Sequence, residues 1–216
     1  YSLKKAIDVI ADPDYIEYDL AALPGVTNTS LNTQLISACE ERADALAVVD
    51  LEGGYTPRSE NNNAEADNIG SVEVTVKKLK DLNINSSYGC AFYPWVKIRD
   101  NSANASLYVP PSFPAEGIVI FGQKTLQVTP SALDRVNVRR LLIFLKKEVS
   151  RIASRVLFDQ NVQQTWDRFT GQVIPFLEGV QAGLGLTDFR VLLDDTTTTP
   201  DLVDRNILYA KIFLKP

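Results

Sequence analysis

Alternation between short apolar runs and helical periodicity organises the first fifty residues. Residues 15–23 form a run of apolar and polar positions that ends at Pro24-Gly25, which predicts a strand followed by a turn. Apolar residues then recur at helical spacing from Leu31 to Cys39, and Thr29 or Ser30 can cap that helix. Residues 45–50 form a continuous apolar run, typical of a strand buried on both faces. This order predicts a βαβ unit with a right-handed crossover and a parallel sheet.

The middle of the chain contains a polar stretch and several shorter elements. Residues 53–70 are rich in Asn and acids, which predicts a surface loop. A helix is expected over 72–82, with strands over 89–96 and 106–109, the latter stopped by Pro110-Pro111. A second apolar run at 117–122 predicts another buried strand.

Two long helices and two strands are expected in the last third. The first helix, 134–158, gathers its apolar residues within an arc of about 100°: Val138, Leu141, Leu142, Leu145, Val149, Ile152 and Val156. The second, 162–184, contains Pro175, which we expect to bend it, and has a core stripe of Trp166, Phe169, Val173, Phe176, Leu177, Val180 and Leu184. Strands are predicted at 189–193 and 207–214. The predicted class is α/β, with a mixed sheet that begins with a βαβ unit, is flanked by long helices and closes with C-terminal antiparallel strands.

Charge along the first long helix changes this picture. The chain has 22 basic and 27 acidic residues, a net charge of −5, which argues against nucleic-acid binding by the surface as a whole. Yet residues 135–155 are strongly basic, and apolar Ile143 and Phe144 fall on the same side. A solvated helix face explains the charges, whereas a docking surface explains the two apolar residues as well. The candidate face comprises Arg135, Arg139, Arg140, Ile143, Phe144, Lys146, Lys147, Arg151 and Arg155.

Several chemistries lack the residues that they need. The chain has no histidine, so it has no Ser-His or Cys-His nucleophile pair and lacks the commonest metal ligand. No glycine-rich phosphate loop is present, and Asp194-Asp195 would point to opposite faces of an extended segment. Cys39 and Cys90 lie far apart with no metal motif and are expected to be buried free thiols. We therefore expect a non-enzymatic protein without a cofactor or metal.

Two further observations concern the chain as a whole. It contains no apolar run of membrane-spanning length and no signal-peptide pattern at its start, so no membrane insertion is expected. Methionine is absent even at position 1, which we interpret as a chain that begins inside a longer product.

Two alternatives to a structural, non-enzymatic protein stay open. One is a nucleotide-binding or hydrolytic α/β domain, suggested by the βαβ start alone, and the other is a monomeric adhesion or carrier module.

A set of short strings, in order along the chain, resembles the tail sheath proteins of contractile phage tails, which are related to R-type pyocin and type six secretion sheaths. The later strings are Gly117–Leu126, Asn137–Leu141, Phe158–Asn161 with Thr165-Trp166, and Asp204–Ile212. Leu23–Gly25, Val49-Asp50, Tyr93–Trp95 and Val109–Ser112 look like the family's first half. Relative to the family, a segment is missing near 112–114, and the peripheral domains and a terminal arm are absent. The resemblance thus divides one sheath core into halves at 1–112 and 113–216.

The resemblance implies a structural subunit of the virion tail that assembles in the bacterial host cytoplasm. Its partners would be copies of itself, in six-fold rings and a helical stack, the tail tube protein, and baseplate and tail terminator proteins, with no nucleic acid. Contraction of the sheath would drive the tube through the host envelope. Terminal arms of the family add strands to neighbouring subunits, and the final strand fits that role: Ile207, Leu208, Tyr209, Ala210, Lys211, Ile212, Phe213 and Leu214. The basic helix face would contact the tube or a neighbouring subunit.

Overall fold

The computed structural model describes residues 2–51, 72–92, 96–99, 106–109, 112–113, 117–118 and 122–216. These residues form two compact units, Tyr1–Arg140 and Leu141–Pro216. The predicted meeting point of two halves at 112–113 lies where few residues are described, and it stays a prediction. The loop expected at 53–70 lies outside the described residues.

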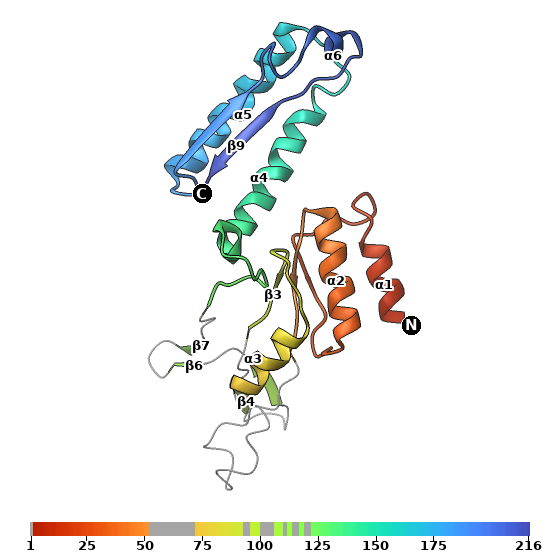
Figure 1. The fold of residues 1–216 in the computed structure, drawn as a ribbon, viewed down its shortest axis with the longest axis vertical. Coiled ribbons are helices and arrows are strands. Elements are labelled where there is room, and N and C mark those ends of the chain that lie inside the picture. The colour runs from red at the N-terminus through yellow and green to blue at the C-terminus, as the bar shows by residue number, and fades with distance from the viewer. Residues whose placement is uncertain are drawn as a thin grey trace. The chain divides into compact units, whose positions relative to one another are not determined.

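A small parallel sheet forms the centre of the first unit. Its order is β1 (Leu20–Ala22), β2 (Leu46–Val48) and β3 (Gly89–Cys90), and both pairs are parallel. Helix α2 (Thr29–Arg42) connects β1 to β2, which confirms the predicted βαβ unit. Helix α1 (Ser2–Ile10) precedes the sheet and is the first helix in Figure 1.

Two local predictions in this unit were wrong in their boundaries. The expected strand at 15–23 is reduced to β1, because the preceding residues follow the end of α1, where the Tyr18 hydroxyl donates to the Ile10 carbonyl. The N-cap of α2 is Asn28 rather than Thr29 or Ser30. Its side-chain oxygen accepts the Leu31 N–H at 3.2 Å, which satisfies a donor that the helix leaves unpaired.

The remaining described elements of the first unit are short. Helix α3 (Val72–Asp81) confirms the prediction for 72–82. The expected strand at 89–96 is divided between β3 and β4 (Val96–Arg99), and residues 93–95 lie outside the described residues. Strand β4 pairs antiparallel with β5 (Ser106–Val109), and β6 (Ser112–Phe113) pairs antiparallel with β7 (Gly117–Ile118). Of the strand expected at 117–122, residues 119–121 lie outside the described residues.

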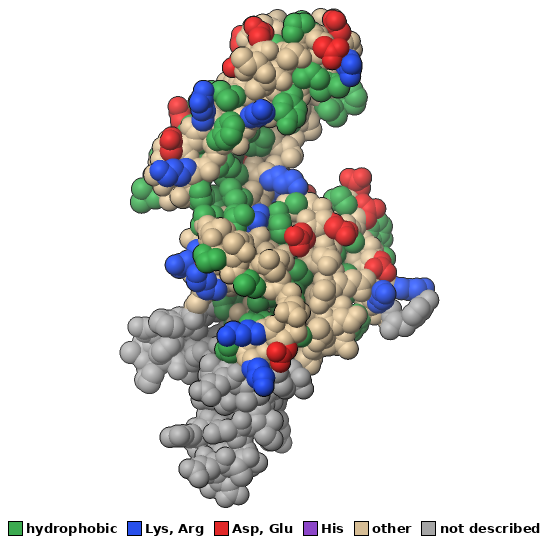
Figure 2. Space-filling model, in the orientation of Figure 1, with side chains coloured by type: hydrophobic (Ala, Val, Ile, Leu, Met, Phe, Trp, Pro, Cys, Tyr) green, Lys and Arg blue, Asp and Glu red, His purple; other side chains and the backbone are tan. Residues whose placement is uncertain are grey.

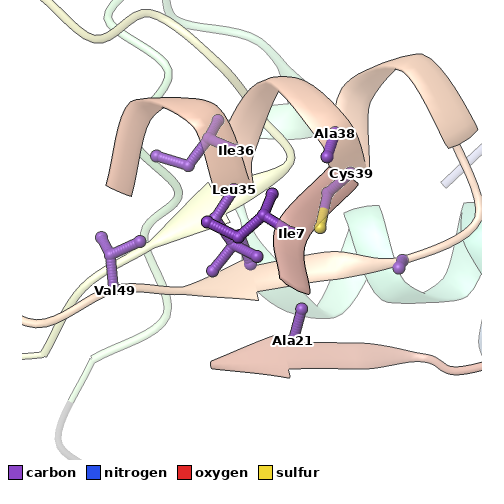
Figure 3. Close-up of a cluster of buried hydrophobic side chains, with 9 residues drawn as sticks. Ile7, Ala21, Leu35, Ile36, Ala38, Cys39 and Val49 are labelled. Atoms are coloured by element: carbon purple, nitrogen blue, oxygen red, sulfur yellow. The ribbon is translucent and has the colours of Figure 1, made fainter. Parts of the chain in front are cut away.

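Side chains from α1, α2 and the sheet form the core of the first unit, which Figure 3 shows in close-up. Leu35 and Cys39 of α2 point toward the sheet together with Ile7 of α1 and are almost completely buried. Cys39 and Cys90 are both free and buried, as expected from their spacing. Burial raises the pKa of both thiols to about 11, so they stay protonated near neutral pH.

The buried guanidinium of Arg42 joins the end of α2 to the segment that follows α1. It binds Asp44 through two nitrogens, at 2.8 and 2.9 Å, and also donates to the carbonyls of Ile10, Asp12 and Ile16. The guanidinium carbon lies 4.3 Å from the centre of the Tyr18 ring. A planar group with five donors can make all these contacts at once, which a lysine cannot.

The second unit consists of two long helices against a two-stranded sheet (Figure 1). Helix α4 (Val136–Ser154) begins in the first unit, after a 3-10 turn at Ala132–Asp134, and is followed by α5 (Gln163–Ala182), which contains Pro175. Strand β8 (Asp188–Leu192) pairs antiparallel with β9 (Lys211–Lys215), and α6 (Pro200–Asp204) lies between them in sequence. Parallel strands after a βαβ start, long helices and a final antiparallel pair confirm the predicted fold class, with the two kinds of pairing in separate sheets.

The predicted helix stripes meet in the core of this unit. Leu145 of α4 and Phe169, Val173 and Leu177 of α5 are buried, and most other stripe residues pack around them. Leu184 is exposed instead: it follows the end of α5 with a φ of 62° and is 93% exposed. The helix was expected to reach 184, but it ends at Ala182, so Leu184 turns away from the core.

The final strand is shorter than expected. It was predicted over 207–214 but begins at Lys211. Tyr209, two residues before the strand, is held by other contacts. The buried Thr198 hydroxyl accepts the Tyr209 N–H at 3.1 Å and donates to the Tyr209 carbonyl. We call these two hydrogen bonds the Thr198 latch. They occupy the N–H and the carbonyl of Tyr209, which would otherwise be available to pair with a neighbouring strand.

Replacing Arg42 tests the importance of its buried contacts. Arg42→Met should lower the free energy of unfolding by about 3 kcal/mol, because Asp44 and three carbonyls lose their donors. Urea denaturation would measure the change. Arg205→Met is the control: Arg205 pairs with Asp201 on the surface at 3.3 Å, and its loss should change stability by less than about 0.5 kcal/mol. Equal effects of the two substitutions would contradict this assignment.

Candidate assembly surfaces

The nine residues of the candidate basic face do not share one exposed surface. Arg139 is 8% exposed; its guanidinium lies 4.1 Å from the centre of the Tyr88 ring and donates to the Ser87 hydroxyl. Its Nε has no hydrogen-bond partner. Arg139 therefore belongs to the interior of the first unit, where it holds the start of α4 against the segment before β3.

Four other members of the candidate face also lie apart. Ile143 is 5% exposed and so is unavailable to a partner in this conformation. Lys146 lines a groove on another side of α4. Arg135 precedes α4 and lies 3.5 Å from the Asp134 carboxylate, while Arg140 is exposed within the first unit.

Four residues of the second unit do form a continuous stripe: Phe144, Lys147, Arg151 and Arg155. Their spacings of three and four residues place them on one side of α4 and its end. We call them the basic stripe. Phe144 is 48% exposed, and its ring centre lies 5.9 Å from that of Phe176. Arg151 pairs with Glu148 at 2.7 Å yet keeps 58% of its side chain exposed, so the stripe presents positive charge beside an apolar ring.

An apolar groove of about 210 Å³ lies between α4 and β9, and we call it the α4–β9 groove. It is lined by Leu142, Leu145, Lys146, Val149, Ser150, Leu177, Ile212 and Leu214. Within the described residues β9 pairs with β8 alone, so its other edge has no strand partner. Ile212 and Leu214 point toward the helices, whereas the residues between and beside them point away. Figure 1 shows β9 running beside α4 and α5.

The sequence pattern indicates the strand but not the groove. Residues 207–214 include Ile212 and Leu214, whereas the helix residues that face them were assigned to the core stripe. The apolar spacing of Leu142, Leu145 and Val149 is the same whether a partner strand or the core covers them. The alternation Lys211-Ile212-Phe213-Leu214-Lys215 does distinguish the two faces of β9.

Polar groups elsewhere in the second unit serve the fold. The Asp194 carboxylate accepts hydrogen bonds from the Thr196 hydroxyl and from the N–H groups of Thr196 and Thr197, and these bonds lower its pKa. It therefore stabilises a turn. Across the described residues, no three His, Cys, Asp or Glu side chains are grouped to hold a metal ion. In the same part of the chain no helix is long and apolar enough to cross a membrane.

Comparisons with known proteins find tail sheath proteins of phages. The tail sheath protein of Vibrio phage KVP40 is 39% identical over 104 residues, and that of Enterobacteria phage T4 is 37% identical over 101 residues. These alignments cover 48% and 47% of this chain, but 16% and 15% of the two relatives. The chain thus aligns with about one sixth of the length of each relative. No protein-family model matches the chain.

A likeness in fold extends further than the likeness in sequence. A chain in the cryo-EM structure of the anti-feeding prophage baseplate superimposes with a TM-score of 0.67 at 14% identity. The match covers 99% of this chain and 68% of that one. At this identity the match shows a shared fold. The resemblance indicated by the sequence is confirmed: about half of this chain is similar to phage tail sheath proteins, and nearly all of it shares the fold of a chain in the anti-feeding prophage baseplate.

Proposed function

We propose that this chain is the core of a structural subunit of a contractile tail sheath. The observation that carries the proposal is 39% identity to a tail sheath protein over about half of the chain. In this proposal copies polymerise as stacked rings around a tail tube, and their contraction drives the tube through the host envelope. The subunit works by repacking its interfaces, without catalysis or a cofactor. It assembles in the host cytoplasm and resides in the virion tail, where it meets the tube, baseplate and terminator proteins.

The free edge of β9 is our candidate for the link between subunits. A terminal arm of a neighbouring copy would add a strand there, and main-chain hydrogen bonds would supply the affinity. The α4–β9 groove would take the apolar side chains of that arm, since most of its lining residues are apolar. Such a link is supported by an unpaired edge and an apolar recess at the same place. Residues 211–214 of the predicted edge lie in the strand, whereas 207–210 precede it.

The basic stripe is our candidate for contact with an acidic tube. Arg151 and Arg155 are exposed and Lys147 is half-buried, so each surface ion pair would contribute about 0.2 to 1 kcal/mol. Weak individual contacts suit a surface that must release the tube during contraction. Phe144 would add apolar area to these contacts. Arg139 and Ile143 are left out of this surface because they are buried.

Electron microscopy of the concentrated protein tests the proposed function. We expect stacked rings or tubular polymers, and light scattering should show mass growing with concentration. A protein that stays monomeric at all concentrations would contradict the sheath proposal and favour an adhesion or carrier module. A thermal-shift screen with nucleotides would serve as a control for the hydrolytic alternative, and we expect no shift.

Filling the α4–β9 groove tests strand addition. Ser150 is exposed and lines the groove, so Ser150→Trp should obstruct an incoming strand without disturbing the core. We expect the protein concentration at which half the protein sediments as polymer to rise about tenfold or more, equivalent to about 1.4 kcal/mol. Ser154→Trp, an exposed site on the same helix that is not in the groove lining, is the matched control and should change it less than about twofold. Normal polymerisation of Ser150→Trp would rule out this edge.

Charge reversal tests the basic stripe. Lys147→Glu combined with Arg151→Glu should abolish cosedimentation with purified tail tubes, because an acidic tube would then be repelled. Polymerisation without tubes should persist, and binding of the wild type should weaken as salt increases. Lys77→Glu with Lys80→Glu, at exposed sites on α3, gives the same charge change elsewhere and should leave tube binding intact. Undiminished tube binding by the stripe variant would refute this role.

A further inference from the structure

The outer face of the β8–β9 sheet has a composition that the core does not explain. The side chains that alternate with the core residues along the two strands face away from the helices. Cross-strand register pairs Asp188 with Lys215, Arg190 with Phe213, and Leu192 with Lys211. This outer sheet face therefore carries three cations and one carboxylate around a phenyl ring.

Aromatic side chains on or beside this face are exposed to an extent that contact with solvent alone does not explain. Phe213 is 54% exposed, and Tyr209, two residues before the start of β9, is 53% exposed. The Lys211 ammonium lies 5.8 Å from the centre of the Tyr209 ring. None of the three cations forms a salt bridge within the described residues, although Arg190 is near enough to help lower the pKa of Asp194. Exposed rings framed by available cations are typical of a docking site for an acidic surface.

The same unit carries a surface of the opposite charge. The loop after β8 and helix α6 contain Asp194, Asp195, Asp201 and Asp204, all exposed, against Arg205. The Asp201 side chain is 71% exposed although it pairs with Arg205. Figure 2 shows acidic side chains gathered at the end of this unit where α6 lies. We call residues 194–205 the acidic end.

We infer that the outer sheet face of one copy docks against the acidic end of the next copy, in a head-to-tail contact. Charge complementarity within a single sequence favours a second copy as the partner, because each copy then supplies both surfaces. A heterologous contact of this kind closes into a ring or extends as a helix. The inference rests on the proposed self-assembly and is separate from strand addition, which uses the edge and the inner side of β9.

A pair of charge-reversed variants tests the contact. The face variant is Arg190→Glu with Lys211→Glu, and the end variant is Asp201→Lys with Asp204→Lys. Each alone would place like charges in contact, so we expect the concentration for half-polymerisation to rise about tenfold or more. Mixed in equal amounts, the two variants restore opposite charges at every contact and should polymerise within about threefold of the wild type.

The control keeps the charge change but moves it off the proposed contact. Lys77→Glu with Lys80→Glu should polymerise like the wild type, and circular dichroism should show all variants folded. Normal polymerisation of the face variant, or a mixture no better than its separate components, would overturn the inference while leaving the sheath proposal intact. A wild type that does not polymerise would overturn both.

Discussion

The two-stranded β8–β9 sheet is too narrow to cover both long helices, α4 and α5, and the surface features of the second unit follow from that constraint. The inward side chains of β8 and β9 must shield the apolar stripes of α4 and α5, yet the sheet ends at β9 within the described residues. The stripe of α4 therefore extends beyond the strand that covers it, which leaves the α4–β9 groove. An unpaired strand edge and an uncovered apolar helix face are thus two aspects of one incomplete layer.

Local patterns were sufficient to predict most elements of the chain. The continuous apolar run at 45–50 has few alternatives to a buried strand, and the stripes of α4 and α5 persist over several turns, so both were predicted correctly. Boundaries failed where side chains compete for backbone groups. Asn28 caps the N-terminus of α2, and Thr198 binds the backbone of Tyr209 and keeps it out of strand β9. Neither contact can be predicted from the spacing of hydrophobic residues.

The candidate basic face failed as a single surface for a different reason. Periodicity places residues around a helix but does not show which side another segment covers. Tyr88 and Ser87 lie more than fifty residues before Arg139 and cover its guanidinium through tertiary contact. The same limitation applies to Lys146, which sequence placed with the other cations and the fold placed in the groove. The basic stripe, of which Phe144, Arg151 and Arg155 are exposed and Lys147 is half-buried, has the spacing of one helix face.

The Thr198 latch also has a mechanical meaning. A chain that binds along β9 and is then pulled would load the strand along its own axis, where the hydrogen bonds to β8 resist together in shear. Force that reaches the start of β9 meets the buried Thr198 hydroxyl, which holds both the N–H and the carbonyl of Tyr209. Under the proposed strand addition, the loop between Thr198 and Tyr209 would thereby be shielded from tension, because the two hydrogen bonds close it at its ends.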